Sequence, residues 1–240
     1  MSIFRDSFDR WFYPDVDCNW DDEVFRDNII SCLKTDYSVL DYGAGRGNVV
    51  QMNFRGTVSL VCGVDPDEGV LGNPYLDEGK VLDLSSGLIP YPDGSFDVVF
   101  SDNVMEHVQD PEKVLLEIKR VLKPGGVFLA KTPNKWHYMP VIARLTPNWF
   151  HVWYNKIRGR KETDTFPTVY RLNTKKAIKR FCARADLAVK EIDMIEKRPE
   201  YLRVFFVFYL MGIVYERIVN LSKAFSFFRC LIIFIAQKPL

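Results

Sequence analysis

Three glycines spaced two residues apart follow an acidic residue in the segment VLDYGAGRGNVV, residues 39–50. Asp41 precedes Gly43, Gly45 and Gly47, and apolar residues flank the segment on both sides. Because glycine has no Cβ, such a bend can turn tightly and a ligand can approach its backbone closely. The carboxylate beside the bend repels phosphate and attracts a cation. The segment therefore predicts a binding site for a ligand that carries positive charge.

Two further acids follow short apolar runs, Asp65 in GVDPD and Asp83 in VLDL. The carboxyl ends of parallel strands share one edge of a sheet, and ligands of such sheets bind there. At this edge Asp65 can accept hydrogen bonds from both hydroxyls of a ribose, and Asp83 lies within reach of an adenine amino group. Three acids in register, with Asp41, match a ligand with an ammonium end, a ribose and an adenine. The alternative for any single acid is a carboxylate that caps a turn.

Alternating strand-like and helix-like runs from Ser38 to about Ala130 predict a parallel sheet covered by helices. The expected strands are SVLDY, TVSLVCGVD, GKVLDL, SFDVVFS and GVFLAKT. Asn19 is expected to cap a helix through WDDEVFRDNIISCLK, and Asp110 with Pro111 to open the helix PEKVLLEIKRVL. Asn173 or Thr174 is expected to begin a third helix, TKKAIKRFCARA.

Beyond Thr132 the pattern loosens. Residues 133–170 are rich in aromatic and basic side chains without a clear period, and we expect them to form a lid over an acceptor pocket. Two late strands, LAVKEIDMI and CLIIFIAQKP, flank an apolar helical region, residues 202–222. Its uncharged run VFFVFYLMGIVY has 12 residues, whereas a membrane-spanning helix needs about 20. This region is therefore expected to be either a buried helix or a helix on a membrane surface.

Composition indicates a single domain over residues 1–240, with 48% hydrophobic and 26% charged residues and no linker-like spacer. The net charge of +1 hides an asymmetry: residues 1–130 hold 11 basic and 23 acidic side chains, and residues 131–240 hold 21 and 8. The basic part either neutralises the acidic part or faces an anionic partner. Five dispersed cysteines indicate neither a zinc site nor a disulfide framework, so no metal is expected and a reducing cytoplasm fits best.

The segments VLDYGAGRG, GVDP, KVLDL, GSFDVVFSDNVMEHVQDPEKVLLEIKRVLKPGG and VFLAKTPN, in this order, closely resemble class I S-adenosylmethionine-dependent methyltransferases. The resemblance is to their small-molecule branch (methyltransferase type 11-like) and covers roughly residues 38–134. It implies a three-layer α/β sandwich with a Rossmann-like, mostly parallel seven-stranded sheet, whose last two strands are antiparallel. Residues 202–222 would then be an insertion between those two strands.

The resemblance also implies S-adenosylmethionine as the cofactor and a role for each of several residues. Asp41 and the three glycines would hold its methionine part, Asp65 the ribose, Asp83 with Leu84 the adenine, and residues 101–103 the floor beneath the sulfonium. The implied cofactor-binding residues are Asp41, Gly43, Gly45, Gly47, Asp65, Pro66, Asp83, Leu84, Ser101 and Asn103. The chain departs from the family pattern at PDEGVLGNPYLDEGK, where three glycines and two prolines stand in place of a regular helix.

Methyl transfer needs the acceptor to be aligned with the sulfonium, and it needs a base when the acceptor arrives protonated. Glu106 and His107, in NVMEHV, are the candidates for that base. The alternative is that Glu106 is solvated and His107 caps or packs against the next helix. The aromatic and basic residues of the expected lid favour a small-molecule, glycan or lipid-linked acceptor with an apolar body and an anionic group.

Other functions remain in competition. A nicotinamide-dependent oxidoreductase is disfavoured by the DxGxGxG spacing and by Asp41, because the dinucleotide fingerprint aims a helix end at a pyrophosphate. A non-catalytic protein that binds S-adenosylmethionine stays open. A nucleic-acid partner is disfavoured by the near-neutral net charge, whereas peripheral contact with a membrane and the oligomeric state stay open.

Overall fold

The computed structural model describes residues 10–14, 18–146, 167–203 and 205–240. These residues form a seven-stranded sheet in the order β3-β2-β1-β4-β5-β7-β6. The strands are β1 (Ser38–Tyr42), β2 (Leu60–Asp65), β3 (Glu78–Val81), β4 (Phe96–Asp102), β5 (Leu122–Pro133), β6 (Ala188–Ile195) and β7 (Leu231–Gln237). Strands β1 to β5 pair in parallel, and β7 pairs antiparallel with both β5 and β6. The predicted α/β class and the antiparallel final pair are confirmed.

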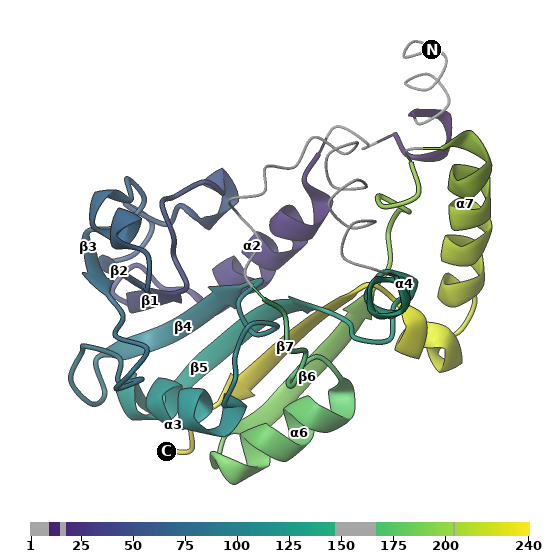
Figure 1. Ribbon diagram of the computed structural model, residues 1–240. Coiled ribbons are helices and arrows are strands. Elements are labelled where there is room, and N and C mark those ends of the chain that lie inside the picture. Colours follow the sequence, from purple (N-terminus) through teal and green to yellow (C-terminus); the bar gives the residue numbers. More distant parts are fainter. Residues whose placement is uncertain (1–9, 15–17, 147–166, 204) are drawn as a thin grey trace.

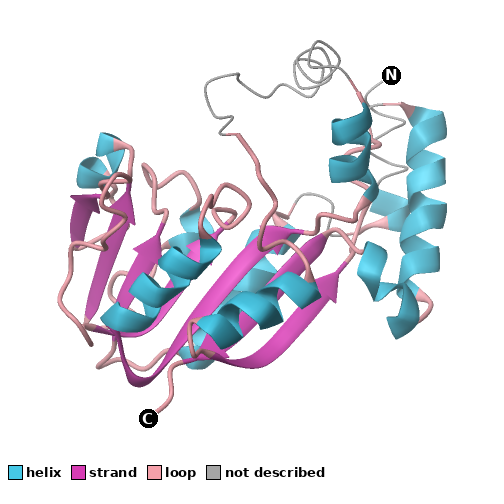
Figure 2. Ribbon diagram, turned by 60° about the horizontal axis from the view of Figure 1, so that its bottom comes forward, coloured by secondary structure: helices cyan, strands magenta, loops and turns pink. Residues whose placement is uncertain are grey.

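Helices cover both faces of the sheet (Figures 1 and 2). The helices are α2 (Trp20–Cys32), α3 (Pro111–Val121), α4 (Tyr138–Leu145), α6 (Lys175–Arg184) and α7 (Phe206–Asn220), with short 3₁₀ turns η1 (Val50–Met52), η2 (Glu68–Gly72) and η4 (Lys223–Phe228). Because successive side chains of a strand point to opposite faces, Leu40 joins the core beneath α3 and α6, while its neighbour Val39 joins the core beneath α2. The result is a three-layer sandwich.

Side chains cap the starts of α3 and α6, whereas α2 lacks the side-chain cap that the sequence predicts. Asp110 accepts a hydrogen bond from the Lys113 amide at the start of α3, and Thr174 accepts one from the Ala177 amide at the start of α6. Asn19 occupies the cap position of α2, but its side chain makes no capping hydrogen bond. The predicted side-chain cap is therefore wrong, and the backbone carbonyl of Asn19 instead accepts from the Glu23 amide.

The connection from β2 to β3 contains the 3₁₀ turn η2 where the family pattern has a regular helix, as its glycines indicated. Within residues 133–170, the sequence suggested no regular element, yet α4 forms directly after β5. Residues 147–166, which include Trp149, His151, Trp153 and Tyr154 of the expected lid, lie outside the described residues.

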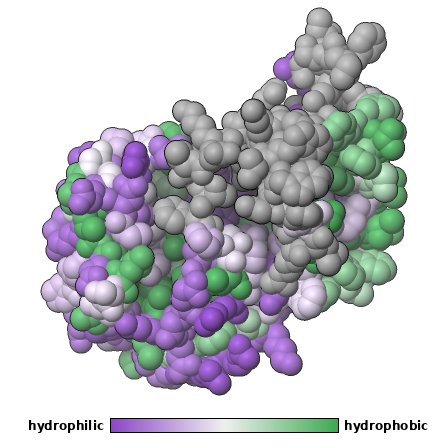
Figure 3. All heavy atoms as spheres, in the orientation of Figure 1, coloured by the Kyte–Doolittle hydropathy of each residue, from purple (hydrophilic) through white to green (hydrophobic). Residues whose placement is uncertain are grey.

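Helix α7 lies between β6 and β7 in the chain and stands beyond the end of the sheet (Figure 1). Its inner side is buried through Tyr209, Ile213 and Val219. Gly212 permits this packing, because a Cβ there would come within 2.5 Å of the Pro199 Cβ. Apolar residues nevertheless gather on the outer surface of this part of the molecule, where Figure 3 shows green spheres over α7.

Candidate functional site

The glycine-rich bend after β1 has a backbone that depends on its glycines. Gly43, Gly45 and Gly47 all have positive φ, at +91°, +50° and +77°, a region that other residues rarely adopt. The Gly43 and Ala44 amides donate to the Val64 carbonyl of β2 at 2.8 and 3.2 Å. A Cβ on Gly43 would come within 2.2 Å of the Val104 Cγ2. The bend is therefore fixed against β2 and against the loop that follows β4.

A pocket of about 170 Å³ opens at this bend. The residues that line it are Asp41, Gly43, Ala44, Gly45, Arg46, Gly47, Asn48, Val49, Met52, Asn73, Tyr75 and Asp102. Four of the predicted site residues, Asp41 and the three glycines, are thus brought together. The other predicted residues do not line this pocket.

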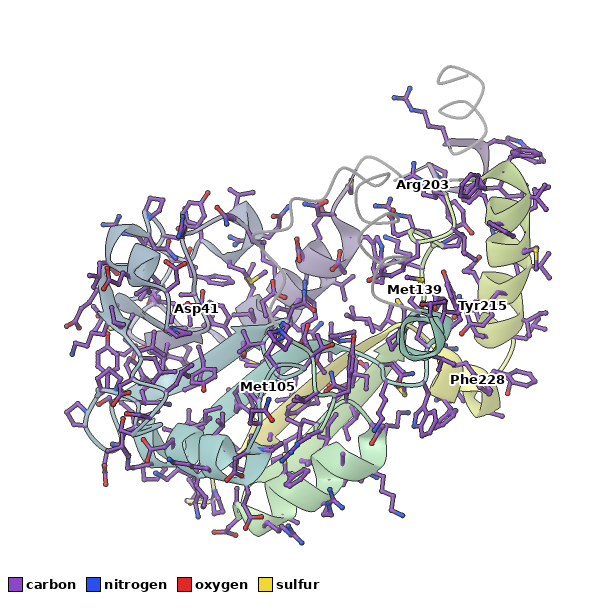
Figure 4. The ribbon with its side chains drawn as sticks, in the orientation of Figure 1. Asp41, Met105, Met139, Arg203, Tyr215 and Phe228 are labelled. Atoms are coloured by element: carbon purple, nitrogen blue, oxygen red, sulfur yellow. The ribbon has the colours of Figure 1, made fainter. Side chains whose placement is uncertain are left out.

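Asp41 is the buried acid of this pocket; it is labelled in Figure 4. Its exposed fraction is 6%, and within the described part of the chain no cation or hydrogen-bond donor is paired with its carboxylate. Burial, together with the nearby charges of Asp102 and Asp65, raises the pKa of Asp41 well above its usual value. A cationic ligand in the pocket would relieve this repulsion and stabilise the ionised carboxylate.

A second acid of the pocket, Asp102, belongs to a charge cluster that the sequence analysis did not identify. It lies 2.9 Å from the ammonium group of Lys131, which is fully buried. The same ammonium contacts Asp21 at 3.3 Å and also Asp22, both in the first turn of α2. Burial outweighs the attraction of Lys131 and raises the pKa of Asp102 to about 6.

Lys131 remains charged in this cluster. Burial lowers its pKa, but the three carboxylates around it outweigh burial, and the net shift is upward. Lys131 therefore ties the start of α2 to the end of β4, beside the pocket. Asp102 is the last residue of β4, so the sequence did contain a fourth acid at a strand end. The rest of its cluster depends on contacts of Lys131 with Asp21 and Asp22 across 110 and 109 residues.

Asp65 ends β2 beside the bend. Its two carboxylate oxygens accept hydrogen bonds from the amides of Gly45 and Asp67, at 3.0 and 2.8 Å. Because an ionised carboxylate has about four acceptor positions, Asp65 retains capacity for further donors. Pro66 follows it directly.

Asp83 lies beyond the end of β3, in a turn. Its carboxylate accepts from the amide and hydroxyl of Ser85 at 2.8 and 2.7 Å, and these bonds lower its pKa to about 2. Leu84 is 69% exposed.

The strand-end acids are staggered rather than in register. Asp41 is paired with Gly63, and Asp65 with Val81. Each acid therefore lies two residues further along than the acid on the preceding strand, which is a step of about 7 Å. The expectation of equal register is wrong. From Asp41 on β1 to Asp83 beyond β3, each acid is displaced further in the strand direction.

The predicted residues at the end of β4, Ser101 and Asn103, have structural partners. The hydroxyl of Ser101 is buried and donates to the Tyr42 carbonyl at 2.9 Å, joining β4 to β1. Asn103 adopts a positive φ of +53°, and its amide donates to the Lys131 carbonyl at 2.9 Å.

Glu106 is buried, with 6% exposure, and one carboxylate oxygen accepts from the Thr132 hydroxyl at 3.0 Å. The alternative of a solvated Glu106 is therefore wrong. Burial raises its pKa. The Nδ1 atom of His107 lies 3.1 Å from the Pro167 carbonyl oxygen, and its Nε2 lies 4.0 Å from Glu106.

Comparisons with known proteins place this geometry in a family. A family model described as a methyltransferase domain matches residues 40–130, the segment with the bend, β2, β4 and α3. A probable S-adenosylmethionine-dependent methyltransferase of Mycolicibacterium smegmatis is 38% identical over 121 residues, which are 47% of this chain and 44% of that protein. Residues 40–130 of the chain therefore match a methyltransferase domain.

Other relatives agree with this assignment of the methyltransferase domain. The ubiquinone biosynthesis O-methyltransferase of Maricaulis maris is 33% identical over 122 residues, 48% of each protein. The chain spans about half the length of the curated relatives it matches. A crystal structure of S-adenosylmethionine-dependent methyltransferases from Methanosarcina mazei has a TM-score of 0.58 at 19% identity and covers 89% of this chain and 97% of that one, a likeness of fold.

The residues around the pocket fit the cofactor of this family. Among the described residues, the carboxylate of Asp41 is buried and has no cation partner, and it lies beside the backbone of Gly45, which has no side chain. A Cβ at Gly45 would meet no atom within 4 Å. The Asp41 carboxylate suits the ammonium group of S-adenosylmethionine, and the open space at Gly45 leaves room for the cofactor beside the backbone.

Proposed function

We propose that this chain transfers a methyl group from S-adenosylmethionine to a small organic acceptor. The observation that carries the proposal is Asp41, a buried carboxylate that lines the pocket and has no cation partner in the part of the chain that the structure describes. Charge in such a place costs free energy unless a ligand compensates it. The dinucleotide of an oxidoreductase would bring phosphates there and increase the repulsion.

Within this proposal, Asp41 binds the ammonium group of the cofactor, and the bend at Gly43, Gly45 and Gly47 follows its methionine part. Asp65 accepts from the ribose hydroxyls with the acceptor positions that its two amide bonds leave. Asp83 and the exposed Leu84 contact the adenine, and Ser101 and Asn103 lie beneath the sulfonium. Cofactor, when bound, supplies an activated methyl carbon, and the protein positions the acceptor in line with it.

Glu106 and His107 are proposed to act on the acceptor. The raised pKa of Glu106 suits a carboxyl group that exchanges a proton. The amides of Val169 and Tyr170 donate to the Glu106 carbonyl at 2.8 and 3.1 Å. This contact joins the end of residues 133–170 to the candidate base, and it supports a lid over the acceptor in that segment.

The acceptor class is proposed to be a small molecule, a glycan or a lipid-linked molecule with an apolar body. The name of the Maricaulis maris relative, an O-methyltransferase of ubiquinone biosynthesis, supports an acceptor of this kind. We place the reaction in the cytoplasm, as a proposal that the five unpaired cysteines support.

Calorimetry with S-adenosylmethionine and with NAD tests the cofactor. Binding of the first without the second is expected, and binding of NAD alone would overturn the proposal. Incubation with a methyl-labelled cofactor and a metabolite extract then tests catalysis, with labelled product identified by mass spectrometry. Tight cofactor binding with no transfer to any metabolite would favour a non-catalytic binding protein.

A further inference from the structure

Helix α7 and the following turn η4 expose a row of large apolar side chains. We call this the α7–η4 surface. Its residues are Phe206, Val207, Phe208, Leu210, Met211, Val214, Ile218, Leu221, Phe225, Phe227 and Phe228, with exposed fractions from 39% to 77%. Single exposed apolar residues are common on proteins, but a contiguous patch marks an interaction surface.

The exposed side chains are distinct from those that hold α7 in place. Tyr209, Ile213 and Val219 face inward and are buried, whereas Val207 and Val214 are 66% and 58% exposed. The helix is thus apolar on both sides, and Tyr209, Ile213 and Val219 belong to the side that is buried. Figure 4 labels Tyr215 and Phe228, and the hydroxyl of Tyr215 donates to the Phe228 carbonyl at 2.5 Å. This bond holds η4 beside α7, so the two segments form one surface.

The charges of this surface have a single sign. Between residues 201 and 229, Glu216 is the one acidic residue. Its side chain is buried and accepts a hydrogen bond from Tyr13 at 3.1 Å. Arg217 has a 60% exposed side chain and lies 3.4 Å from a carboxylate oxygen of the buried Glu216, and Lys223 is exposed at the start of η4. The rim of the apolar row is therefore cationic.

The length of α7 decides how it can meet a bilayer. Its 15 residues extend about 22 Å at 1.5 Å per residue, less than the roughly 30 Å of a hydrocarbon core. Within the described ranges, no helix is long and apolar enough to cross a membrane. A short helix with bulky apolar side chains and a basic rim instead lies in the plane of the interface.

We propose that the α7–η4 surface docks the protein on an anionic lipid bilayer, with α7 parallel to the membrane. Anionic headgroups complement Arg217 and Lys223, while the aliphatic and phenyl groups enter the boundary between headgroups and acyl chains. A second copy of the chain complements the surface less well, because face-to-face pairing would bring two sets of cations together.

Flotation of the full chain with vesicles tests this proposal without any cofactor, so its outcome is independent of methyl transfer. We expect the chain to float with phosphatidylcholine vesicles that contain phosphatidylglycerol, and to float less in high salt, because salt screens the headgroup charge. Lys223→Gln should weaken binding about fivefold. The triple variant V207Q/M211Q/V214Q should weaken it about tenfold or more, because three exposed apolar side chains are removed.

The matched control replaces exposed apolar residues elsewhere on the surface, as L88Q/L116Q, whose parent side chains are 56% and 47% exposed. This control should float like the unaltered chain. Failure of the unaltered chain to float with anionic vesicles at low salt would overturn the proposal. An equal loss of vesicle binding in V207Q/M211Q/V214Q and in the control L88Q/L116Q would also overturn it. Sedimentation of the parent and of the triple variant tests the alternative of a second copy. If the parent does not bind vesicles and the triple variant has a lower mass in solution than the parent, the surface joins two copies of the chain instead.

Discussion

Substitution of Gly45 by alanine separates what the bend contributes to folding from what it contributes to ligand binding. Gly45 has φ +50°, and an added Cβ would meet nothing within 4 Å. Gly94, in the turn before β4, has φ +63° and equally open surroundings, but it does not line the pocket. The two substitutions therefore impose the same kind of backbone strain, and only one of them adds an atom at the site.

The expected magnitudes follow from this pairing. A residue with a Cβ in the left-handed region costs about 1–2 kcal/mol, and each kcal/mol lowers the Tm of a chain of this size by about 2–4 °C. Both Gly45→Ala and Gly94→Ala should therefore melt roughly 2–8 °C lower. Crowding of the bound cofactor in Gly45→Ala should cost a further ~1–3 kcal/mol, which is a loss of about 5- to 150-fold in affinity.

Differential scanning calorimetry without ligand measures the first effect, and titration calorimetry with S-adenosylmethionine measures the second. Gly94→Ala should bind the cofactor like the unaltered chain. Unaltered affinity in Gly45→Ala would refute the assignment of this pocket to the cofactor. A much larger fall in Tm for Gly45→Ala than for Gly94→Ala would mean that the glycine serves the fold alone.

Three further predictions concern the charged groups of the site. Because burial and neighbouring acids raise the pKa of Asp41, binding of the cationic cofactor should release a proton from Asp41, and cofactor affinity should increase with pH. Calorimetry in buffers of different ionisation enthalpy should detect the released proton, and Asp41→Asn should abolish this proton release. Lys131→Met leaves buried carboxylates without their cation and should cost about 3–5 kcal/mol in urea unfolding, whereas Asp21→Asn, which changes a partner with a 37% exposed side chain, should cost less than about 1 kcal/mol. Glu106→Gln and His107→Ala should each reduce turnover with the true acceptor and leave cofactor affinity intact; unchanged turnover in either variant would remove that residue from the proposed mechanism.

The order of the strands, the helices other than α4 and the position of the glycine-rich bend could be predicted from the amino-acid sequence. These features are local: the apolar period of a strand, the proline after Asp110 and the positive φ that Gly43 requires are each encoded within a few residues. The sequence predicts that Asp83 ends the third strand and leaves a turn-capping carboxylate as the alternative. The structure ends β3 at Val81 and places Asp83 in a turn, where it accepts from Ser85.

Which distant groups share a site could not be predicted from the sequence and follows from the packing of the elements. This packing brought Lys131 of β5 between Asp102 and the first turn of α2, staggered the strand-end acids, and buried Glu106 beneath Thr132. It also left one apolar side of α7 exposed although the amino-acid pattern is apolar all round. The physical reason is that burial and ion pairing are properties of the space between elements, and that space depends on packing and strand register, which no local pattern specifies.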